Sequence, residues 1–322
     1  MSRILTGIQS TGTPHLGNLL GAIIPSIELS KDSDNECLFF IADLHSFTTI
    51  RDPKILRENT YATAAVWLSF GFDTNKNLLY KQSDVTEVCE LTWYLNCFTP
   101  YQRLQLSHSF KDKSNRLSEI NAGLFTYPIL MASDILLYDA DLVPVGKDQI
   151  QHLEITRSIA SKFNYKYPDT FIVPSVKIDE KVMIVPGTDG QKMSKSYGNV
   201  IDIFLEKKKL RKQVMSIKTD SKSLEDPKDT DNCNIFNLYK LIASKDQINQ
   251  LNNRYKAGNF GYGDAKNELY EIICEKYSEQ IDKFHFLMNN KNLIDQELEN
   301  GAKKAKLIAK EVLSRVRKNI GY

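Results

Sequence analysis

The sequence predicts an α/β fold, in which helices connect the strands of a parallel sheet and a mostly helical segment follows. Three observations predict it. Short apolar runs typical of buried strands alternate with helical segments before Asn199. A glycine-rich stretch follows the first of these runs. After Asn199 the pattern changes to long, charged, amphipathic segments with few strand signals, so we place a domain boundary near Ile203.

Composition narrows the class of protein. The chain has 322 residues, of which 42% are hydrophobic, enough for one large domain or two. No run approaches the ~18 apolar residues of a membrane span, and the polar N-terminus does not resemble a signal peptide, so we expect a cytoplasmic protein without membrane contact. A net charge of +2 predicts no indiscriminate nucleic-acid binding, DNA included. Five cysteines without Cys-x-x-Cys spacing predict reduced thiols and no bound metal.

The first strand and the loop after it predict a nucleotide site. Residues 4–8 predict a short buried strand, and a helix begins near Gly17 after a glycine-rich stretch. Backbone N–H groups at a helix start can bind phosphate, and glycines allow close approach. The spacing of Gly7 and Gly12 suits a phosphate loop, but Thr13-Pro14 replaces its Lys-Ser/Thr pair, and no Gly-x-Gly-x-x-Gly occurs. Phosphate-loop ATPases and dinucleotide dehydrogenases are therefore disfavoured.

The next elements follow β-α-β order. Residues 37–42 and 78–80 predict buried strands. Between them, Asp52 can cap a helix that Gly71 ends. A second helix is predicted to begin with a capping-box-like pair, Asp84 and Glu87, and to stop at residues 99–100. Sites in such sheets gather at the carboxyl ends of strands, where residues 7–17 and 42–45 would fall.

A lysine-rich loop is the second candidate for phosphate binding. Residues 192–196, Lys-Met-Ser-Lys-Ser, set two ammonium groups and two hydroxyls on a loop entered through residues 187–190. Lysine supplies a mobile charge for phosphate oxygens, but an ordinary solvated loop would have the same composition. His15, taken alone, is equally compatible with packing. The two features together favour a nucleotide site.

Residues 15–18, His-Leu-Gly-Asn, resemble the HIGH signature of the class I aminoacyl-tRNA synthetases, and residues 192–196 match their KMSKS signature letter for letter. Residues 121–138 and 143–157 resemble the tryptophanyl-tRNA synthetase family in particular, and the similarity extends over nearly the whole chain. The resemblance implies a Rossmann-like catalytic domain over residues 1–202 and a helical, anticodon-binding domain over residues 203–322. It also implies a homodimer that uses L-tryptophan, ATP with Mg²⁺, and tRNA(Trp).

The resemblance implies roles for individual residues. Charge on the leaving pyrophosphate would be neutralised by the catalytic group, which comprises Lys192, Lys195, Lys113 and His15. Contacts to ATP are expected from Gln9, Ser10, Thr11, Gly17, Asn18, Gly146, Lys147, Asp148, Val185, Lys192, Met193, Ser194, Lys195 and Ser196.

Tryptophan requires an apolar pocket with one acceptor for its indole N–H. Asp134 is the matching acceptor, and Tyr127, Met131 and Ile135 lie on nearly the same helix face. The alternative to a ligand pocket is an ordinary core helix whose carboxylate is hydrogen-bonded within the protein. The remaining pocket residues are expected to be Val143, Val145, Gln149, His45, Leu5 and Gly7.

Other interpretations of the sequence stay open. A tyrosyl-tRNA synthetase of the same subclass also uses a buried aspartate, and a small nucleotidyltransferase has a similar His-x-Gly-His loop. A non-catalytic tRNA-binding paralogue is a further alternative. Local basic clusters could contact RNA or form solvated helix faces: residues 207–212, and Lys303, Lys304, Lys306, Lys310, Arg315, Arg317 and Lys318 in the tail.

Overall fold

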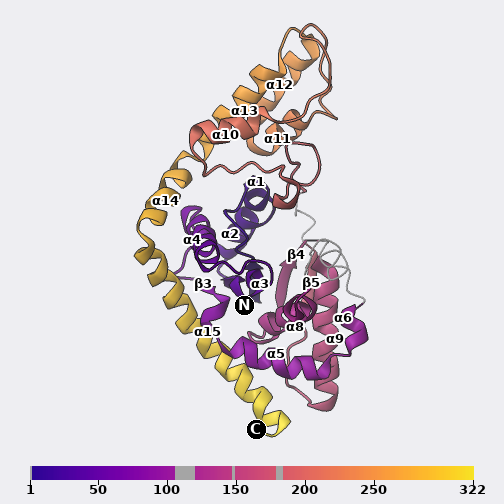
Figure 1. Ribbon diagram of the computed structural model, residues 1–322, viewed down its shortest axis with the longest axis vertical. Helices are drawn as coiled ribbons and strands as arrows, with labels where there is room; N and C mark the ends of the chain where they lie inside the picture. The colour runs from indigo at the N-terminus through magenta and orange to yellow at the C-terminus, as the bar shows by residue number, and fades with distance from the viewer. Residues whose placement is uncertain (1, 106–119, 147–148, 179–183) are drawn as a thin grey trace. The chain divides into compact units, whose positions relative to one another are not determined.

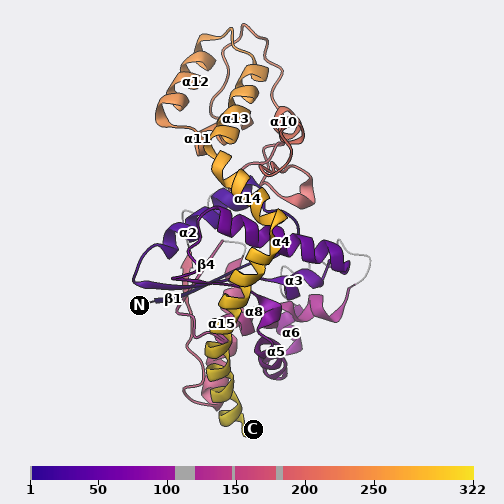
Figure 2. The ribbon, with the colours of Figure 1, turned by 90° about the vertical axis from the view of Figure 1, so that its left-hand side faces the viewer.

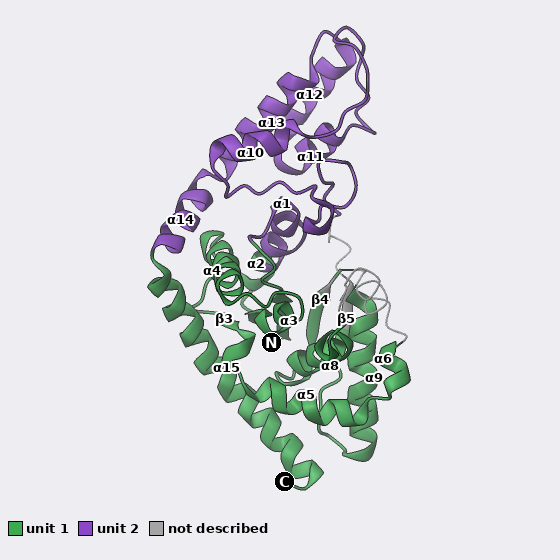
Figure 3. Ribbon diagram, viewed as in Figure 1, with its two compact units in different colours: residues 1–12, 27–180, 290–322 green, residues 13–26, 181–289 purple. Residues whose placement is uncertain are grey.

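The computed structural model, shown in Figure 1, describes residues 2–105, 120–146, 149–178 and 184–322. The chain forms two compact units (Figure 3). Unit 1 comprises residues 1–12, 27–180 and 290–322, and unit 2 comprises residues 13–26 and 181–289. These units divide the chain differently from the predicted boundary between residues 202 and 203, because the last helix belongs to the unit that contains the sheet. The predicted assignment of functions to residues 1–202 and 203–322 stays a prediction.

Within the described residues, unit 1 contains a five-stranded parallel sheet in the order β3-β2-β1-β4-β5. The strands predicted at residues 4–8, 37–42 and 78–80 are confirmed, and two further strands were not predicted. The apolar residues of β2 are buried, as expected for a strand covered on both faces. The bounds are β1 Ser2–Ile8, β2 Asn35–Ile41, β3 Leu78–Lys81, β4 Leu142–Val145 and β5 Ser175–Ile178.

This strand order places a topological switch between β1 and β4, where ligands bind at the carboxyl ends of strands in open α/β sheets. The chain continues into Gln9 after β1, into Ala42 after β2 and into Gln82 after β3. Helices of unit 1 connect β2 to β3, β3 to β4 and β4 to β5, and its last helix follows β5 in the chain. Their bounds are α3 Asp43–Phe47, α4 Pro53–Ser69, η2 Gln82–Asp84, α5 Glu87–Phe98, α6 Tyr101–Gln105, α8 Ala122–Leu136, α9 Ile150–Lys166 and α15 Lys291–Ile320.

The predicted ends of α4 are confirmed, whereas the predicted start of α5 is wrong. Asp52 accepts hydrogen bonds from the backbone N–H groups of Lys54 and Ile55 at 2.8 and 3.0 Å. Gly71 follows α4 with a φ of 88°, which a residue with a side chain rarely adopts. Asp84 does not cap α5, because it lies in the short 3₁₀ helix η2, and the cap position belongs to Thr86.

Helix α15 packs along the edge strand β3 and contacts α5 (Figure 1), and Figure 2 shows it running down the near side of unit 1 to the C-terminus. The predicted apolar stripe is confirmed, since Ala305, Ala309 and Val316 are buried in the main core. Gly301 allows the helix to approach the strand, because a Cβ atom there would lie 2.0 Å from the Leu79 carbonyl oxygen. The helix thereby covers a strand edge that could otherwise pair with another chain.

Unit 2 is helical apart from its loops. The segment after Gly12 winds through α1, the π-helical turn η1 and the start of α2, and the helix predicted near Gly17 is confirmed. Among the described residues of both units, no helix is long and apolar enough to cross a membrane. The bounds are α1 Leu16–Asn18, η1 Leu19–Ile23, α2 Ile24–Ser30, η4 Lys195–Tyr197, α10 Lys207–Met215, α11 Asn234–Ile242, α12 Lys245–Ala257, α13 Tyr262–Lys276 and α14 Ser278–Asn289.

Candidate active site

Unit 1 contains a buried carboxylate with three hydrogen-bonded contacts. Asp134 lies on α8 and is 2% exposed. His45 Nε2 lies 2.9 Å from Asp134 Oδ2, and Gln82 Nε2 donates to both carboxylate oxygens at 2.8 Å. Burial raises the pKa of Asp134, while its hydrogen bonds to His45 and Gln82 act in the opposite direction. The carboxylate therefore forms a buried polar network with His45 and Gln82 on an otherwise apolar face of α8.

Gln82 was not among the predicted site residues. Its Oε1 accepts hydrogen bonds from the backbone N–H groups of Leu44 and His45 at 3.1 and 3.3 Å. A signal was present in the sequence, since Gln82 follows the third strand at its carboxyl end. His45, one of the predicted pocket residues, is hydrogen-bonded to Asp134.

The other predicted pocket residues are only partly grouped around Asp134. The Tyr127 hydroxyl is hydrogen-bonded to His152 Nε2 at 3.1 Å, and its ring lies edge-on to His45. Ile135, Leu5 and Val143 belong to the main core, and Met131 packs against it. Gly7 is needed for packing, because a Cβ there would lie 2.4 Å from the Phe40 ring. Gln149 is half-buried at the start of α9, and of Val145 only the strand backbone is described.

Ser10, predicted to bind ATP, lies in a buried cluster of hydroxyl groups. Its backbone N–H and its hydroxyl both contact Ser46 Oγ, at 2.9 and 3.1 Å. The Thr60 hydroxyl donates to Ser10 Oγ at 3.3 Å. These contacts fix the chain where it leaves β1. Gln9 and Thr11, on either side, are exposed.

In unit 2, His15 caps the short helix α1. His15 Nδ1 accepts from the Asn18 backbone N–H at 3.3 Å, and Asn18 Oδ1 accepts from the His15 backbone N–H at 3.1 Å. Burial, together with the charge of Lys195, lowers the pKa of His15 to about 4. The imidazole is therefore neutral near pH 7. Because Nδ1 accepts, the ring proton is assigned to Nε2, which makes that atom a hydrogen-bond donor.

The lysine loop contacts the helix start through Met193. The Gly17 backbone N–H lies 3.2 Å from Met193 Sδ, and Met193 is buried. The Met193 N–H donates to the carbonyl of Val185, which is also buried. The structure therefore brings together four predicted nucleotide-site residues, the fourth being His15, whose ring lies close to Gly17.

Lys195 lies in a partly desolvated position. As a residue it is exposed, yet nearby protein atoms displace enough water from its ammonium group to lower its pKa to about 8. Burial raises the pKa of Asp202 to about 6, against the charge of Lys195 and a hydrogen bond from the Phe204 N–H. Lys195 is thus a cation at neutral pH that can lose its proton within a mildly alkaline range.

Three predicted residues, Lys113, Lys147 and Asp148, lie outside the described residues. Gly146 is described, and its carbonyl accepts from the Gln149 N–H at 2.9 Å. Lys192 and Ser196 are exposed, and the Ser194 hydroxyl accepts from the Ser196 N–H at 3.3 Å.

The parallel sheet of unit 1 and the two signature segments of unit 2, residues 15–18 and 192–196, agree with a class I synthetase. The family model for class I tRNA synthetases (W and Y) matches residues 1–278, so the chain belongs to this family. Its relatives indicate which of the two amino-acid types of this family the chain resembles. It is 46% identical over 319 residues to the tryptophan–tRNA ligase of Rhodopirellula baltica, with 99% of each chain covered. It is 47% identical over 322 residues to that of Fusobacterium nucleatum, with 100% of this chain and 98% of the relative covered.

A solved structure agrees with this assignment. The crystal structure of tryptophanyl-tRNA synthetase from Campylobacter jejuni, complexed with ADP and tryptophan, is 44% identical, with a TM-score of 0.95. The match covers 99% of this chain and 100% of that one. Within its family, the chain is therefore of the bacterial tryptophanyl type.

Proposed function

We propose that the chain is a tryptophan–tRNA ligase that activates L-tryptophan with ATP. A carboxylate oxygen of tryptophan forms a bond to the α-phosphorus, and the bond from that phosphorus to pyrophosphate breaks. A terminal ribose hydroxyl of tRNA(Trp) then attacks the acyl carbon, and AMP leaves. The observation that carries the amino-acid assignment is Asp134, a buried acceptor with two fixed donors, in a chain of the tryptophanyl type.

Unit 1 supplies amino-acid selection in this proposal. The indole N–H is only a donor, so it needs an acceptor inside an apolar pocket. Asp134 is that acceptor. Tyr127 and Ile135 are buried on the same helix, Met131 is half-buried there, and Val143 is buried on β4. A pocket that pairs a polar ligand atom rejects ligands without it strongly.

Unit 2 supplies charge for the activation step. Negative charge grows on pyrophosphate as it leaves, and preorganised cations and donors stabilise that charge. Lys192 and Lys195 are the cations, and the Nε2–H of neutral His15 is a donor. Because the stabilised charge develops only in the transition state, these groups should affect the rate of activation more than tryptophan affinity.

Mg²⁺ is proposed as a companion of ATP. In the part of the chain that is described, His, Cys, Asp and Glu side chains form no group of three or more that could hold a metal. Mg²⁺ commonly keeps several waters and binds substrate phosphates with one or two carboxylates. ATP would therefore carry the ion.

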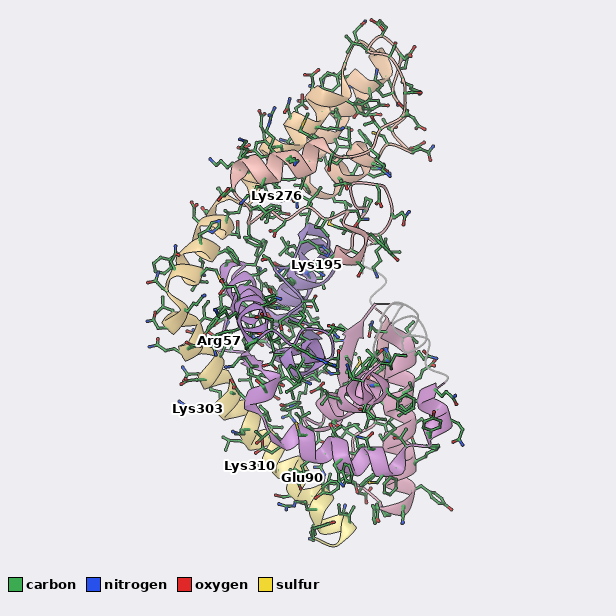
Figure 4. The ribbon with its side chains drawn as sticks, in the orientation of Figure 1. Arg57, Glu90, Lys195, Lys276, Lys303 and Lys310 are labelled. Atoms are coloured by element: carbon green, nitrogen blue, oxygen red, sulfur yellow. The ribbon has the colours of Figure 1, made fainter. Side chains whose placement is uncertain are left out.

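For tRNA we favour α10 over α15. Four lysines and an arginine lie on α10 or directly at its ends, and Lys207, Lys208 and Lys212 are exposed there. On α15, Arg315 is paired with Asp139 at 2.5 Å and Arg317 with Glu90 at 3.1 Å. Lys303 and Lys310 lie on the outer side of α15 (Figure 4). Phosphate contact through α10 would weaken steeply as salt rises.

We propose that a second copy of the chain covers part of α5. Trp93 is 68% exposed, and Cys89 and Cys97, four residues away in each direction, are exposed on the same helix face. Tyr101, at the start of α6, is a further exposed aromatic residue. Size-exclusion chromatography with light scattering should give the mass of a dimer for the native chain and of a monomer for Trp93→Glu.

Amino-acid-dependent exchange of pyrophosphate into ATP tests the function. We expect exchange with tryptophan and much lower efficiency with tyrosine, whose single ring fills an indole-sized apolar pocket less completely. Exchange with tyrosine alone would instead identify the tyrosyl alternative, and no exchange with any amino acid would identify a non-catalytic paralogue.

A further inference from the structure

The side-chain amide of Gln82 can have only one orientation. Its Oε1 lies within hydrogen-bonding distance of two backbone N–H groups, those of Leu44 and His45, and neither can accept. The amino group, Nε2, is consequently directed at Asp134. Gln82 is 2% exposed, so water does not compete for these contacts.

The contacts leave Asp134 with one oxygen that can accept further. Gln82 Nε2 is shared between both oxygens, and His45 Nε2 adds a contact to Oδ2 alone. A carboxylate has about four lone-pair positions. Among the described residues, Oδ1 has one shared donor and Oδ2 has two contacts, so Oδ1 has more acceptor capacity left.

We propose that Gln82 is a positioning residue for amino-acid selection: it holds the Asp134 carboxylate in one orientation, with Oδ1 left to accept the ring N–H of tryptophan. This inference rests on the proposed function of Asp134. Gln82 itself need not touch the substrate, because its donor is already engaged by the carboxylate.

The charged and titratable groups around Asp134 set the expected pH dependence. Those that interact with it electrostatically are His45 and Asp43 on α3, Cys89 on α5, Tyr80 on β3, and Tyr138 in the turn after α8. Burial and Asp43 raise the pKa of Asp134, whereas His45 and Gln82 lower it. Removing the Gln82 donor therefore raises this pKa further. The acid limb of tryptophan binding should then move to higher pH.

The main variant is Gln82→Met, which keeps the length of the side chain and removes its polar atoms. Its KM for tryptophan in pyrophosphate exchange should rise about tenfold at neutral pH, with kcat little changed. The acid limb of kcat/KM for tryptophan should move to higher pH. Gln250→Met, at an exposed position on α12, is the matched control and should match the native chain.

A substrate analogue separates positioning from general damage. L-β-(3-benzothienyl)alanine has sulfur where tryptophan has its ring N–H, so it cannot donate to Asp134. The penalty of Gln82→Met should be present for tryptophan and small for this analogue. Equal penalties for the two substrates, or an acid limb that stays in place, would overturn the proposal.

Gln82→Glu is a second variant, which tests the proposal if Gln82→Met does not fold. A glutamate at this position meets the Asp134 carboxylate with like charge at high pH, and can donate to it once protonated. Its KM for tryptophan should therefore fall as the pH is lowered, the reverse of the native trend, and a native-like trend would contradict the proposal. If the native chain failed to activate tryptophan, the proposed function would fail instead, so the two failures are distinguishable.

Discussion

Asn199 Nδ2 donates a 2.7 Å hydrogen bond to Asp189 Oδ1, which joins the glycine-rich entry of the lysine loop, residues 192–196, to the segment after the loop. The same amide contacts the Lys192 carbonyl at 3.1 Å, and Asn199 Oδ1 accepts from the Ser194 N–H at 2.8 Å. Asn199 is 3% exposed. Gly187 makes this packing possible, because a Cβ there would lie 2.4 Å from the Asn199 amide. One buried amide therefore sets the conformation of the loop backbone.

Asn199→Asp should slow activation by about tenfold, since the new carboxylate faces Asp189 without a donor between them. KM for tryptophan should stay near the native value. Adding Asp189→Asn restores a donor between the two side chains, so the double variant should recover part of the lost kcat. Pyrophosphate exchange by the single and double variants measures this, and a double variant no faster than Asn199→Asp would contradict the role of the pair.

Gly301→Ala should lower the free energy of unfolding by about 1–3 kcal/mol, because the added methyl group meets the Leu79 backbone, which cannot move aside cheaply. Denaturant unfolding measures the loss. Gly263→Ala is the matched control: it lies in α13 with open space around it, so better helix propensity should stabilise it by up to about 1 kcal/mol. Equal effects at the two positions would refute the close packing of α15 on β3.

The efficiency of activation should fall as pH rises through about 8, where Lys195 loses its proton. The sign follows from its pKa, which is lowered from 10.5, so the cation is present below about 8 and lost above it. The measurement is kcat/KM for ATP against pH, which reports the free enzyme.

Two variants test the origin of this alkaline limb. Lys195→Arg keeps its charge at all accessible pH values, so the limb should disappear. Asp202→Asn removes a charge that raises the pKa of Lys195, so the limb should move to lower pH. An unchanged limb in both variants would show that another group titrates.

Asp134→Ala should raise KM for tryptophan about 10- to 100-fold, the range expected for a lost hydrogen bond to a charged group. The fold should persist, as checked by circular dichroism and thermal melting. Global unfolding of this variant would instead support the alternative, in which the Asp134 carboxylate only stabilises a core helix.

The sequence predicted elements with strong local signals and missed those that depend on distant partners. Asp52, Pro53 and Gly71 mark both ends of α4, and these signals need no tertiary context. Strands β4 and β5 have four residues each, and Pro144 interrupts the pattern of β4. The stripe of α15 predicted a buried face, but periodicity does not identify what that face packs against, which is β3.

The same distinction holds for the site. His15, Met193 and Lys195 lie in motifs, and the structure brings them together in unit 2. Gln82 is a single glutamine with no periodic partner, and its importance depends on Asp134 lying beside it after folding. Lys113, Lys147 and Asp148 lie outside the described residues, and the roles of all the candidate site residues remain predictions.

The most direct test of the account is the comparison of kcat with tryptophan affinity in Lys195→Ala. The account assigns Lys195 to charge that develops as pyrophosphate leaves, so kcat for exchange should fall by at least about 100-fold. The dissociation constant for tryptophan, measured by titration without ATP, should change less than about threefold. Equal losses in kcat and in tryptophan affinity would contradict the assignment.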